Sequence, residues 1–376
     1  MLSSQLIKNN RPIKEIVVEN IKRLLNDSNC VLFGAGLIGE SVYSFISENI
    51  GSGDDKIRCF VDNNPLKWGT NYMGKPVLSA DEVFSSYNGE AVIISCGTGD
   101  AIMAQLSKYD IPDEKIYIPD ITAIREDDIE FIERNLNYFN LLYDELADEK
   151  SKEVLASILN YKLIHDTSYI QKIADKEENQ YFDDELIKFT QDDVFLDCGG
   201  YIGDTIESYC RHNKGLYKQI ICLEADSDNY KILQKMKNDY RVELYNIAAY
   251  NKESELCFDK RDVGFASGSG TVLEGKSPKV QHILVKGNTI DNILHSREVT
   301  FIKMDIEGAE YQALIGAADT IHNYKPTLMI SVYHKQDDLI KIPLLIKSLN
   351  YKYKLYLRHY QSRSVQETVL YAINED

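Results

Sequence analysis

Two stretches of this chain share one form, in which an apolar strand runs into a glycine-rich turn that opens a helix. The first is "CVLFGAGLIGES", Cys30 to Ser41, and the second is "VFLDCGGYIGDT", Val194 to Thr205. Each is followed by further strand and helix patterns in alternation. Such alternation is typical of a parallel sheet with helices on both faces, so we expect an α/β protein with two Rossmann-like units.

The 376 residues divide into three parts by pattern. Residues 1–120 are predicted to form a Rossmann-like N-terminal domain. Residues 121–190 lack strand patterns and are predicted to be a helical linker or subdomain with acidic faces. Residues 191–376 are predicted to form the second α/β domain. Its last two strand patterns are joined by a short polar turn, so the final strand should run antiparallel in an otherwise parallel sheet.

Composition excludes several classes of partner. The formal net charge of −17 argues against nucleic acid, because phosphate binding needs a basic surface. No run approaches the roughly 20 apolar residues of a membrane-spanning helix. The first residues, "MLSSQLIKNNRPIKEI", lack the apolar core of a secretory signal, so we expect a cytoplasmic protein.

The first glycine loop has the spacing G-x-G-x-x-G, at Gly34, Gly36 and Gly39, and Asp62 ends the next strand. This pattern lets a helix N-terminus approach a pyrophosphate, while the acid accepts hydrogen bonds from a ribose. It therefore predicts a nucleotide or a nucleotide-sugar in the N-terminal domain. The spacing alone is a weak signal, and the alternative is a fold element that holds no ligand.

The second loop differs because Asp197 stands directly before its glycines. A carboxylate there would repel a pyrophosphate and favour a cationic group, such as the ammonium of S-adenosylmethionine (SAM), either directly or through water. Glu224, in "CLEAD", ends the next strand and is the predicted ribose acid. The candidate SAM-binding residues are Asp197, Gly199, Gly200, Gly203, Asp204, Thr205, Glu224, Ala225, Asp226, Asn246 and Ala248. For Asp204 and Thr205, capping of the helix is the alternative role.

Residues from about 180 to 373 resemble the FkbM family of SAM-dependent methyltransferases. The resemblance rests on "FLDCGGYIGDT", "LEAD", "NIAAY", "GNTIDNIL", "FIKMDIEGAEYQALIGA" and "SVYHKQDDLIKIP", which occur in this order. It implies a class I methyltransferase sheet with a reversed last strand, and methylation of hydroxyls in sugars and natural products. Gly200 departs from the family, which often has alanine there, and we expect that difference to leave the turn undisturbed.

Polar residues at two predicted strand ends are the catalytic candidates. Asp305 ends "FIKMD", and His334 follows "TLMISVY", the next strand of the sheet. Ligands bind at the carboxyl ends of parallel strands, so both should lie at the catalytic edge. Glu307 is the third candidate and ranks above Glu310, for which the helix dipole is the simpler explanation. Asp305, Glu307 and His334 are also potential metal ligands, but no spacing dictates a site, and we expect no metal.

The sequence therefore predicts a SAM-dependent methyltransferase that acts on a hydroxyl of a small molecule or glycan, with His334 or Asp305 as the base. One alternative is a nucleotide-sugar or NAD-dependent enzyme whose chemistry lies in the N-terminal domain. Another is a module that binds SAM or sugar without catalysis. The segment "GFASGSGT", from Gly264 to Thr271, is expected to be a lid or a plain loop.

Overall fold

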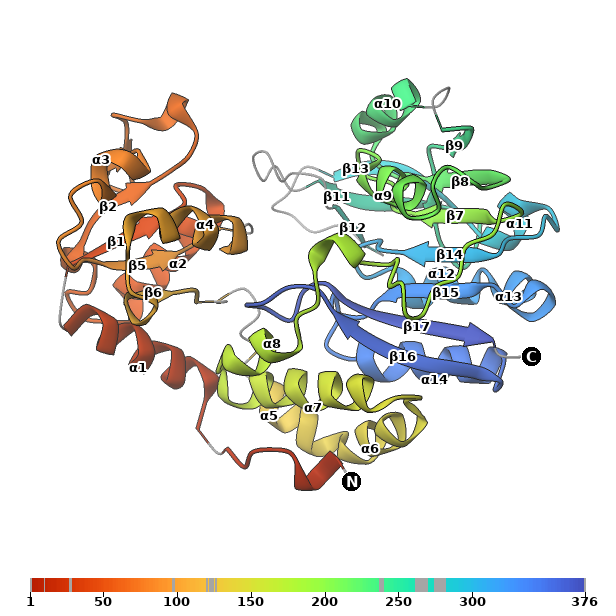
Figure 1. Ribbon diagram of the computed structural model, residues 1–376, viewed down its shortest axis with the longest axis horizontal. Helices are drawn as coiled ribbons and strands as arrows, with labels where there is room; N and C mark the ends of the chain where they lie inside the picture. The colour runs from red at the N-terminus through yellow and green to blue at the C-terminus, as the bar shows by residue number, and fades with distance from the viewer. Residues whose placement is uncertain are drawn as a thin grey trace.

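The computed structural model describes residues 2–9, 11–26, 29–96, 99–119, 121, 125, 127–236, 240–260, 270–273 and 282–374. Two α/β lobes stand side by side, with a layer of helices below the second lobe in the view of Figure 1. The predicted α/β class is confirmed. Most of the predicted lid segment, residues 264–269, lies outside the described residues. Among the helices of the described ranges, none has the length and apolar character needed to cross a membrane.

The N-terminal lobe is built on a six-stranded sheet in the order β3-β4-β2-β1-β5-β6. All neighbouring pairs are parallel except β3 and β4. The strands are β1 (Cys30–Phe33), β2 (Ile57–Val61), β3 (Asn71–Tyr72), β4 (Lys75–Leu78), β5 (Ala91–Ile94) and β6 (Ile116–Tyr117). The helices are α1 (Ile13–Asn26), α2 (Leu37–Asn49), α3 (Ala80–Phe84) and α4 (Gly99–Leu106).

Alternation along β1 explains why both faces of this sheet carry helices. Cys30 and Leu32 pack in one hydrophobic cluster with α1 and α2, while Val31 and Phe33 pack in a second cluster with α3 and α4. Successive side chains of a strand point to opposite faces, and here both faces are buried.

The second lobe has a seven-stranded sheet in the order β16-β17-β15-β14-β7-β8-β9. Its strands are β7 (Val194–Cys198), β8 (Gln219–Leu223), β9 (Val242–Tyr245), β14 (Phe301–Met304), β15 (Thr327–Ser331), β16 (Tyr353–His359) and β17 (Thr368–Asn374). Only β17 runs antiparallel to its neighbours, which confirms the predicted reversed last strand. The helices along this sheet are α9 (Asp204–His212), α10 (Ser227–Met236), α11 (Ile290–Leu294), α12 (Glu310–Ile315), α13 (Ala318–Tyr324) and α14 (Asp338–Leu349).

A smaller sheet, in the order β10-β13-β11-β12, lies beside it. It consists of β10 (Ala248–Ala249), β11 (Ser254–Lys260), β12 (Gly270–Leu273) and β13 (His282–Asn288).

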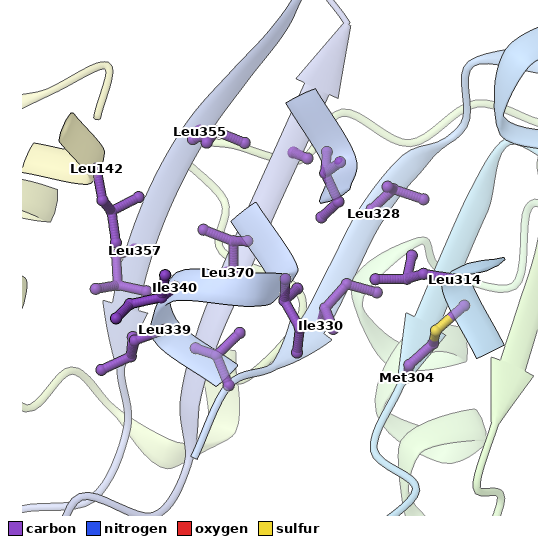
Figure 2. Close-up of a cluster of buried hydrophobic side chains, with 14 of the residues drawn as sticks. Leu142, Met304, Leu314, Leu328, Ile330, Leu339, Ile340, Leu355, Leu357 and Leu370 are labelled. Atoms are coloured by element: carbon purple, nitrogen blue, oxygen red, sulfur yellow. The ribbon is translucent and has the colours of Figure 1, made fainter. Parts of the chain in front are cut away.

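The segment predicted as a helical linker or subdomain packs into the core of the second lobe. Its helices are α5 (Asp128–Arg134), α6 (Leu136–Glu145), α7 (Glu149–Ile164) and α8 (Ser168–Ile173). Figure 2 shows Leu142 of α6 beside Leu357 of β16 and Leu339 and Ile340 of α14, in one hydrophobic cluster. These helices therefore cover the edge of the sheet instead of spacing two domains apart.

The first residues of the chain also lie on these helices. Leu2 is fully buried in the same cluster, the backbone N–H of Ile7 donates to Oδ1 of Asn160 at 2.8 Å, and Asn160 Nδ2 donates to the carbonyl of Gln5 at 3.0 Å. The chain thus starts on the second lobe, forms the N-terminal lobe, and returns. Residues 2–9 accordingly do not pack with the domain that was predicted to begin at residue 1.

Candidate functional site

The turn between β7 and α9 requires its glycines. Gly199 and Gly203 have φ angles of +85° and +96°, in the left-handed region that favours glycine. A Cβ on Gly199 would lie 2.0 Å from the carbonyl oxygen of Asp305, and one on Gly200 would lie 2.2 Å from Sγ of Cys222. Glycine at position 200 therefore fits this turn, as expected, whereas an alanine there would meet the side chain of Cys222.

Asp197 is paired with a lysine that the sequence analysis overlooked. Asp197 is completely buried, and its Oδ1 lies 3.0 Å from Nζ of Lys303, which also donates to the carbonyl of Gly199 at 2.7 Å. Burial raises the pKa of Asp197 to about 6, although Lys303 opposes that shift. Lys303 thus pairs with the carboxylate that was predicted to favour a cationic ligand, and that contact, direct or through water, stays a prediction. The pair also anchors the glycine loop to β14.

Glu224 joins two loops at the ends of β7 and β8. One carboxylate oxygen accepts from the backbone N–H of Tyr201 at 2.8 Å, and the other accepts from that of Asp226 at 2.7 Å. Asn246 Nδ2 donates to the carbonyl of Glu224 at 2.8 Å. Burial raises the pKa of Glu224 to about 7. Glu224, Asp226 and Asn246 thus lie together, as a ribose-binding edge would require.

The other predicted cofactor residues fall into two places. Asp204 and Thr205, at the start of α9, line a large cleft that is described below. Ala248 is buried in β10 with Tyr250 and Leu256, and Ala225 packs against that cluster. The geometry therefore gives Ala248 a packing role, and its contact with SAM stays a prediction.

Asp305, directly after β14, is held by hydroxyl groups and by a histidine. Its Oδ2 accepts from the Tyr181 hydroxyl at 2.8 Å, and its Oδ1 accepts from the Tyr333 hydroxyl at 3.3 Å. His334 Nε2 lies 3.4 Å from Oδ1. Burial opposes ionisation, but His334 and Lys303 hold the pKa of Asp305 below its usual value. The side chain is therefore a carboxylate at neutral pH.

His334 is surrounded by three carboxylates. Its Nδ1 lies 3.0 Å from Glu310, and its Nε2 lies 3.6 Å from Glu307 in addition to its contact with Asp305. Burial alone would lower the pKa of His334, but the carboxylates, Glu310 first, raise it to about 10. A ring with this pKa carries a proton at neutral pH, which argues against the role of base that its ordinary pKa suggested.

Glu310 and Glu307 differ in environment. Glu310 is fully buried, and one of its oxygens accepts from the backbone N–H of Ile306 at 2.9 Å. Glu307 is about one-third exposed and has a positive φ of 56°. Glu310 lies closer to His334 than Glu307 does. The ranking of Glu307 above Glu310 as a catalytic residue stays a prediction.

Asp305, Glu310 and His334 also form a group that could hold a metal ion, with one ligand atom of each within 4.8 Å of the others. A metal bound to His334 would have to displace its proton, which the raised pKa makes costly. The expectation that no metal is needed stays a prediction.

Glu367, just before β17, is a further group that sequence patterns did not reveal. It accepts from the Tyr333 hydroxyl at 3.4 Å and from Gln180. Burial and the charge of Asp305 raise its pKa to about 7. In the sequence, Tyr181 and Glu367 lie outside the motifs, so no pattern pointed to them. Lys303 could have been recognised, because it is a charged residue inside the apolar strand pattern "FIKMD".

A cleft of about 880 Å³ opens at this edge of the sheet and lies between the two lobes. The second lobe contributes Asp305, Tyr181, Glu367 and the start of α9. The N-terminal lobe contributes Ile38, Ile94 and Ala101. The space in front of Asp305 is therefore bounded by both lobes, and its size is that of an ordinary small-molecule site.

The residues of the first glycine loop are in close contact with one another and with the neighbouring strand ends. A Cβ on Gly34 would meet the backbone of Ser95, and one on Gly39 would meet that of Gly34, whereas Gly36 has open space around it. Asp62 accepts from the backbone N–H of Ala35 at 3.0 Å and pairs with Lys67 Nζ at 2.9 Å. Lys67 also donates to the carbonyl of Ala35. The predicted ribose acid is thus already bound by its own loop.

Two protein-family models match the chain, one in each lobe. Residues 197–353 match the family described as "Methyltransferase FkbM domain", which confirms the resemblance seen in the sequence. Residues 26–117 match the family described as "C2185-like, N-terminal". The FkbM match supports a SAM-dependent methyltransferase as the class of enzyme, with SAM as its cofactor, and nothing supports a nucleotide cofactor in the first lobe.

A solved structure shares the fold of this chain. The chain is similar to the methyltransferase FkbM from Methylobacillus flagellatus KT, with a TM-score of 0.65 and 24% identity over 95% of this chain and 93% of that one. Aeropyrum pernix fibrillarin with bound SAM is a more distant match, with a TM-score of 0.32 and 12% identity over 50% of this chain and 70% of that one. No curated protein matches the chain.

Proposed function

We propose that this chain, which carries an FkbM methyltransferase domain, transfers the methyl group of SAM to a hydroxyl of a sugar, glycan or related natural product. The observation that carries the proposal is the position of Asp305, which lines a large cleft at the carboxyl edge of a methyltransferase sheet and lies beside His334. An alcohol stays protonated at neutral pH, so its attack on the methyl group needs a nearby proton acceptor.

SAM would lie along the carboxyl ends of β7 and β8. The turn from Gly199 to Gly203 would approach the methionine part, and Glu224 would accept hydrogen bonds from the ribose hydroxyls. Bound SAM supplies an activated methyl group on its sulfonium. The protein then has to hold the acceptor oxygen in line with that methyl and remove its proton.

Asp305 would accept this proton. Tyr181 and Tyr333 fix the direction of its carboxylate, and the His334 imidazolium keeps it ionised. His334 would therefore act as a positioning residue for Asp305. Glu367 is a second possible proton acceptor, since its pKa of about 7 matches neutral pH.

The lining of the cleft favours a hydroxylated acceptor. Carboxylates and carboxamides, among them Glu177, Gln180, Gln361 and Glu367, offer many hydrogen-bond acceptors to sugar hydroxyls. The carboxylates among them would repel the phosphates of a nucleic acid.

Two isosteric variants test the proposal. Labelled SAM would be incubated with the protein and glycan or glycoside extracts, and methylated products would be identified. Loss of a general base typically slows turnover by about 10²–10⁴. We expect that loss for Asp305→Asn, with the SAM dissociation constant changed less than about threefold. Glu367→Gln should stay within about tenfold of the wild type. If Glu367→Gln lost more turnover than Asp305→Asn, Glu367 would be assigned as the base. Full activity of both variants would contradict acid–base catalysis at this site.

A further inference from the structure

The two lobes present the same kind of edge to one cleft. The N-terminal residues of the cleft come from the end of β5 (Ile94 and Cys96), from the first turns of α2 and α4 (Ile38 and Ala101), and from Ile118 after β6. These positions are the carboxyl edge of the N-terminal parallel sheet. Asp305 lies at the corresponding edge of the second sheet. In open α/β sheets, ligands bind outside the carboxyl ends of the strands.

The two walls differ in polarity. The N-terminal side contributes Ile38, Ile94, Cys96, Ala101, Ile118 and Pro119, none of which carries a charge. The opposite side contributes five carboxylates, from Glu177, Glu178, Asp204, Asp305 and Glu367, and two arginines, Arg211 and Arg363. A ligand that fills this space therefore meets hydrogen-bond acceptors on one side and an apolar surface on the other.

The excess of carboxylates bears on the charge of such a ligand. A phosphate or diphosphate in the cleft would meet more negative than positive groups, which is unfavourable at these separations. A neutral or cationic molecule avoids this repulsion. The lining thus argues against a sugar nucleotide as the acceptor. Asp62, the residue predicted to bind a ribose in the N-terminal lobe, is already paired with Lys67.

We propose that the N-terminal lobe binds the methyl acceptor, and that this acceptor is an uncharged or cationic glycoside with an apolar substituent. Its sugar would face Asp305, and its apolar group would pack on Ile38, Ile94, Ala101 and Ile118. The two glycine-loop lobes would thus serve one reaction, with SAM on the second lobe and part of the acceptor on the first. This inference rests on the proposed methyl transfer to a hydroxyl.

A panel of probes tests the acceptor class on the intact protein. Octyl and p-nitrophenyl glycosides, kept below micelle-forming concentrations, would be compared with the free sugars and with the matching UDP-sugars. We expect the apolar glycosides to have kcat/KM values at least about tenfold above both other groups, as one lost apolar contact is worth roughly that factor. A preference for UDP-sugars, or SAM binding without binding of any glycoside, would overturn the assignment.

Two matched variants test the role of the N-terminal wall. Ala101 and Ala104 are both exposed residues of α4, but only Ala101 lines the cleft. Ala101→Glu should raise the dissociation constant and the KM of an octyl glycoside by about tenfold or more, with kcat and SAM affinity changed less than about twofold. Ala104→Glu should change none of these values. Equal behaviour of the two variants would show that the first lobe does not contact the acceptor.

The readouts separate this inference from the proposed function. Calorimetric binding of the octyl glycoside is measured without SAM, so the wall is tested even if methyl transfer fails. A protein that binds the glycoside through Ala101 but transfers no methyl group would contradict the proposed function alone. A protein that methylates free sugars as well as glycosides, unaffected by Ala101→Glu, would contradict the inference alone.

Discussion

At the level of single residues, the second glycine loop is tightly packed against neighbouring side chains. Gly200 lies where any Cβ would come within 2.2 Å of Cys222 Sγ and 3.2 Å of Leu233. The cysteine is fully buried on β8, the strand next to β7. The tolerance of this position is therefore decided by residue 222, on the neighbouring strand.

We accordingly expect Gly200→Ala to lower the free energy of unfolding by about 1–3 kcal/mol, the usual cost of overpacking. Cys222→Ala in the same chain should recover most of that loss, because it removes the clashing sulfur. Urea unfolding of the two single variants and the double variant would give the coupling. Gly51→Ala is the matched control, since nothing lies within 4 Å of its Cβ position and its φ is not positive, and it should change stability by less than about 0.5 kcal/mol. Additive effects of the first two substitutions would disprove the clash.

The raised pKa of Glu224 predicts a pH dependence of SAM binding. Glu224 accepts hydrogen bonds from ribose most strongly, and through both oxygens, when it is ionised, and burial raises its pKa to about 7. Lowering the pH from 8.5 through 7 to 5.5 protonates Glu224 in the free protein, so SAM affinity should fall by up to about tenfold. Titration calorimetry across this range would measure it. Glu224→Gln should bind weakly with a flatter profile, and an equally steep profile in that variant would assign the dependence to another group.

Among the elements, β16 connects the helical layer to the catalytic edge through one buried arginine. Arg358 is 1% exposed, pairs with Asp148 at 2.7 Å and Asp183 at 3.2 Å, and donates to the Ser151 hydroxyl at 3.0 Å. Asp148 caps the start of α7, and Asp183 lies two residues after Tyr181. The strand thus holds both the first turn of α7 and the segment that orients Asp305.

Removal of this arginine should affect stability and turnover together. Arg358→Met leaves two carboxylates without their partner, and breaking a buried pair costs about 3–5 kcal/mol. Urea unfolding and methyl transfer would both be measured, with Arg358→Lys as the milder change if the first variant does not fold. Arg297→Met removes the partner of Glu243 in a pair that is about one-third exposed, and should cost less than about 1 kcal/mol. If Arg358→Lys kept full turnover, the link to Tyr181 would be of no consequence.

The elements were predicted better than the contacts between them. Alternating strand and helix patterns were enough to predict two parallel sheets, and the short last turn was enough to predict the reversed β17. Strand order then brought Asp305 and His334 to one edge. The pair of Asp197 with Lys303 depends on the register of β7 against β14, which no local pattern reveals. Tyr181 and Glu367 reach Asp305 from segments without motifs, and the charge state of His334 depends on Glu310, whose burial only the fold defines.

At the scale of the whole molecule, the chain is one lobe inserted into another. Residues 2–9 and the segment from α5 onward share the cluster of the second sheet, while the N-terminal sheet has two clusters of its own. Separate hydrophobic cores are typical of domains that can unfold as separate units. The binding of SAM would stabilise only the unit that contains its site.

We therefore expect calorimetric unfolding to show two transitions, of which SAM raises one. At a concentration of about 100 times its dissociation constant, SAM should stabilise the second lobe by about 2.7 kcal/mol. Phe60 is fully buried in the N-terminal sheet, so Phe60→Ala should lower only the other transition, by the roughly 3–5 kcal/mol typical of such a cavity. NAD or UDP-glucose should move neither transition, because Asp62 is held by Lys67 and Ala35. A shift of the Phe60-sensitive transition by either nucleotide would restore the nucleotide site to the first lobe, and a single transition raised by SAM would show that the two lobes unfold as one body.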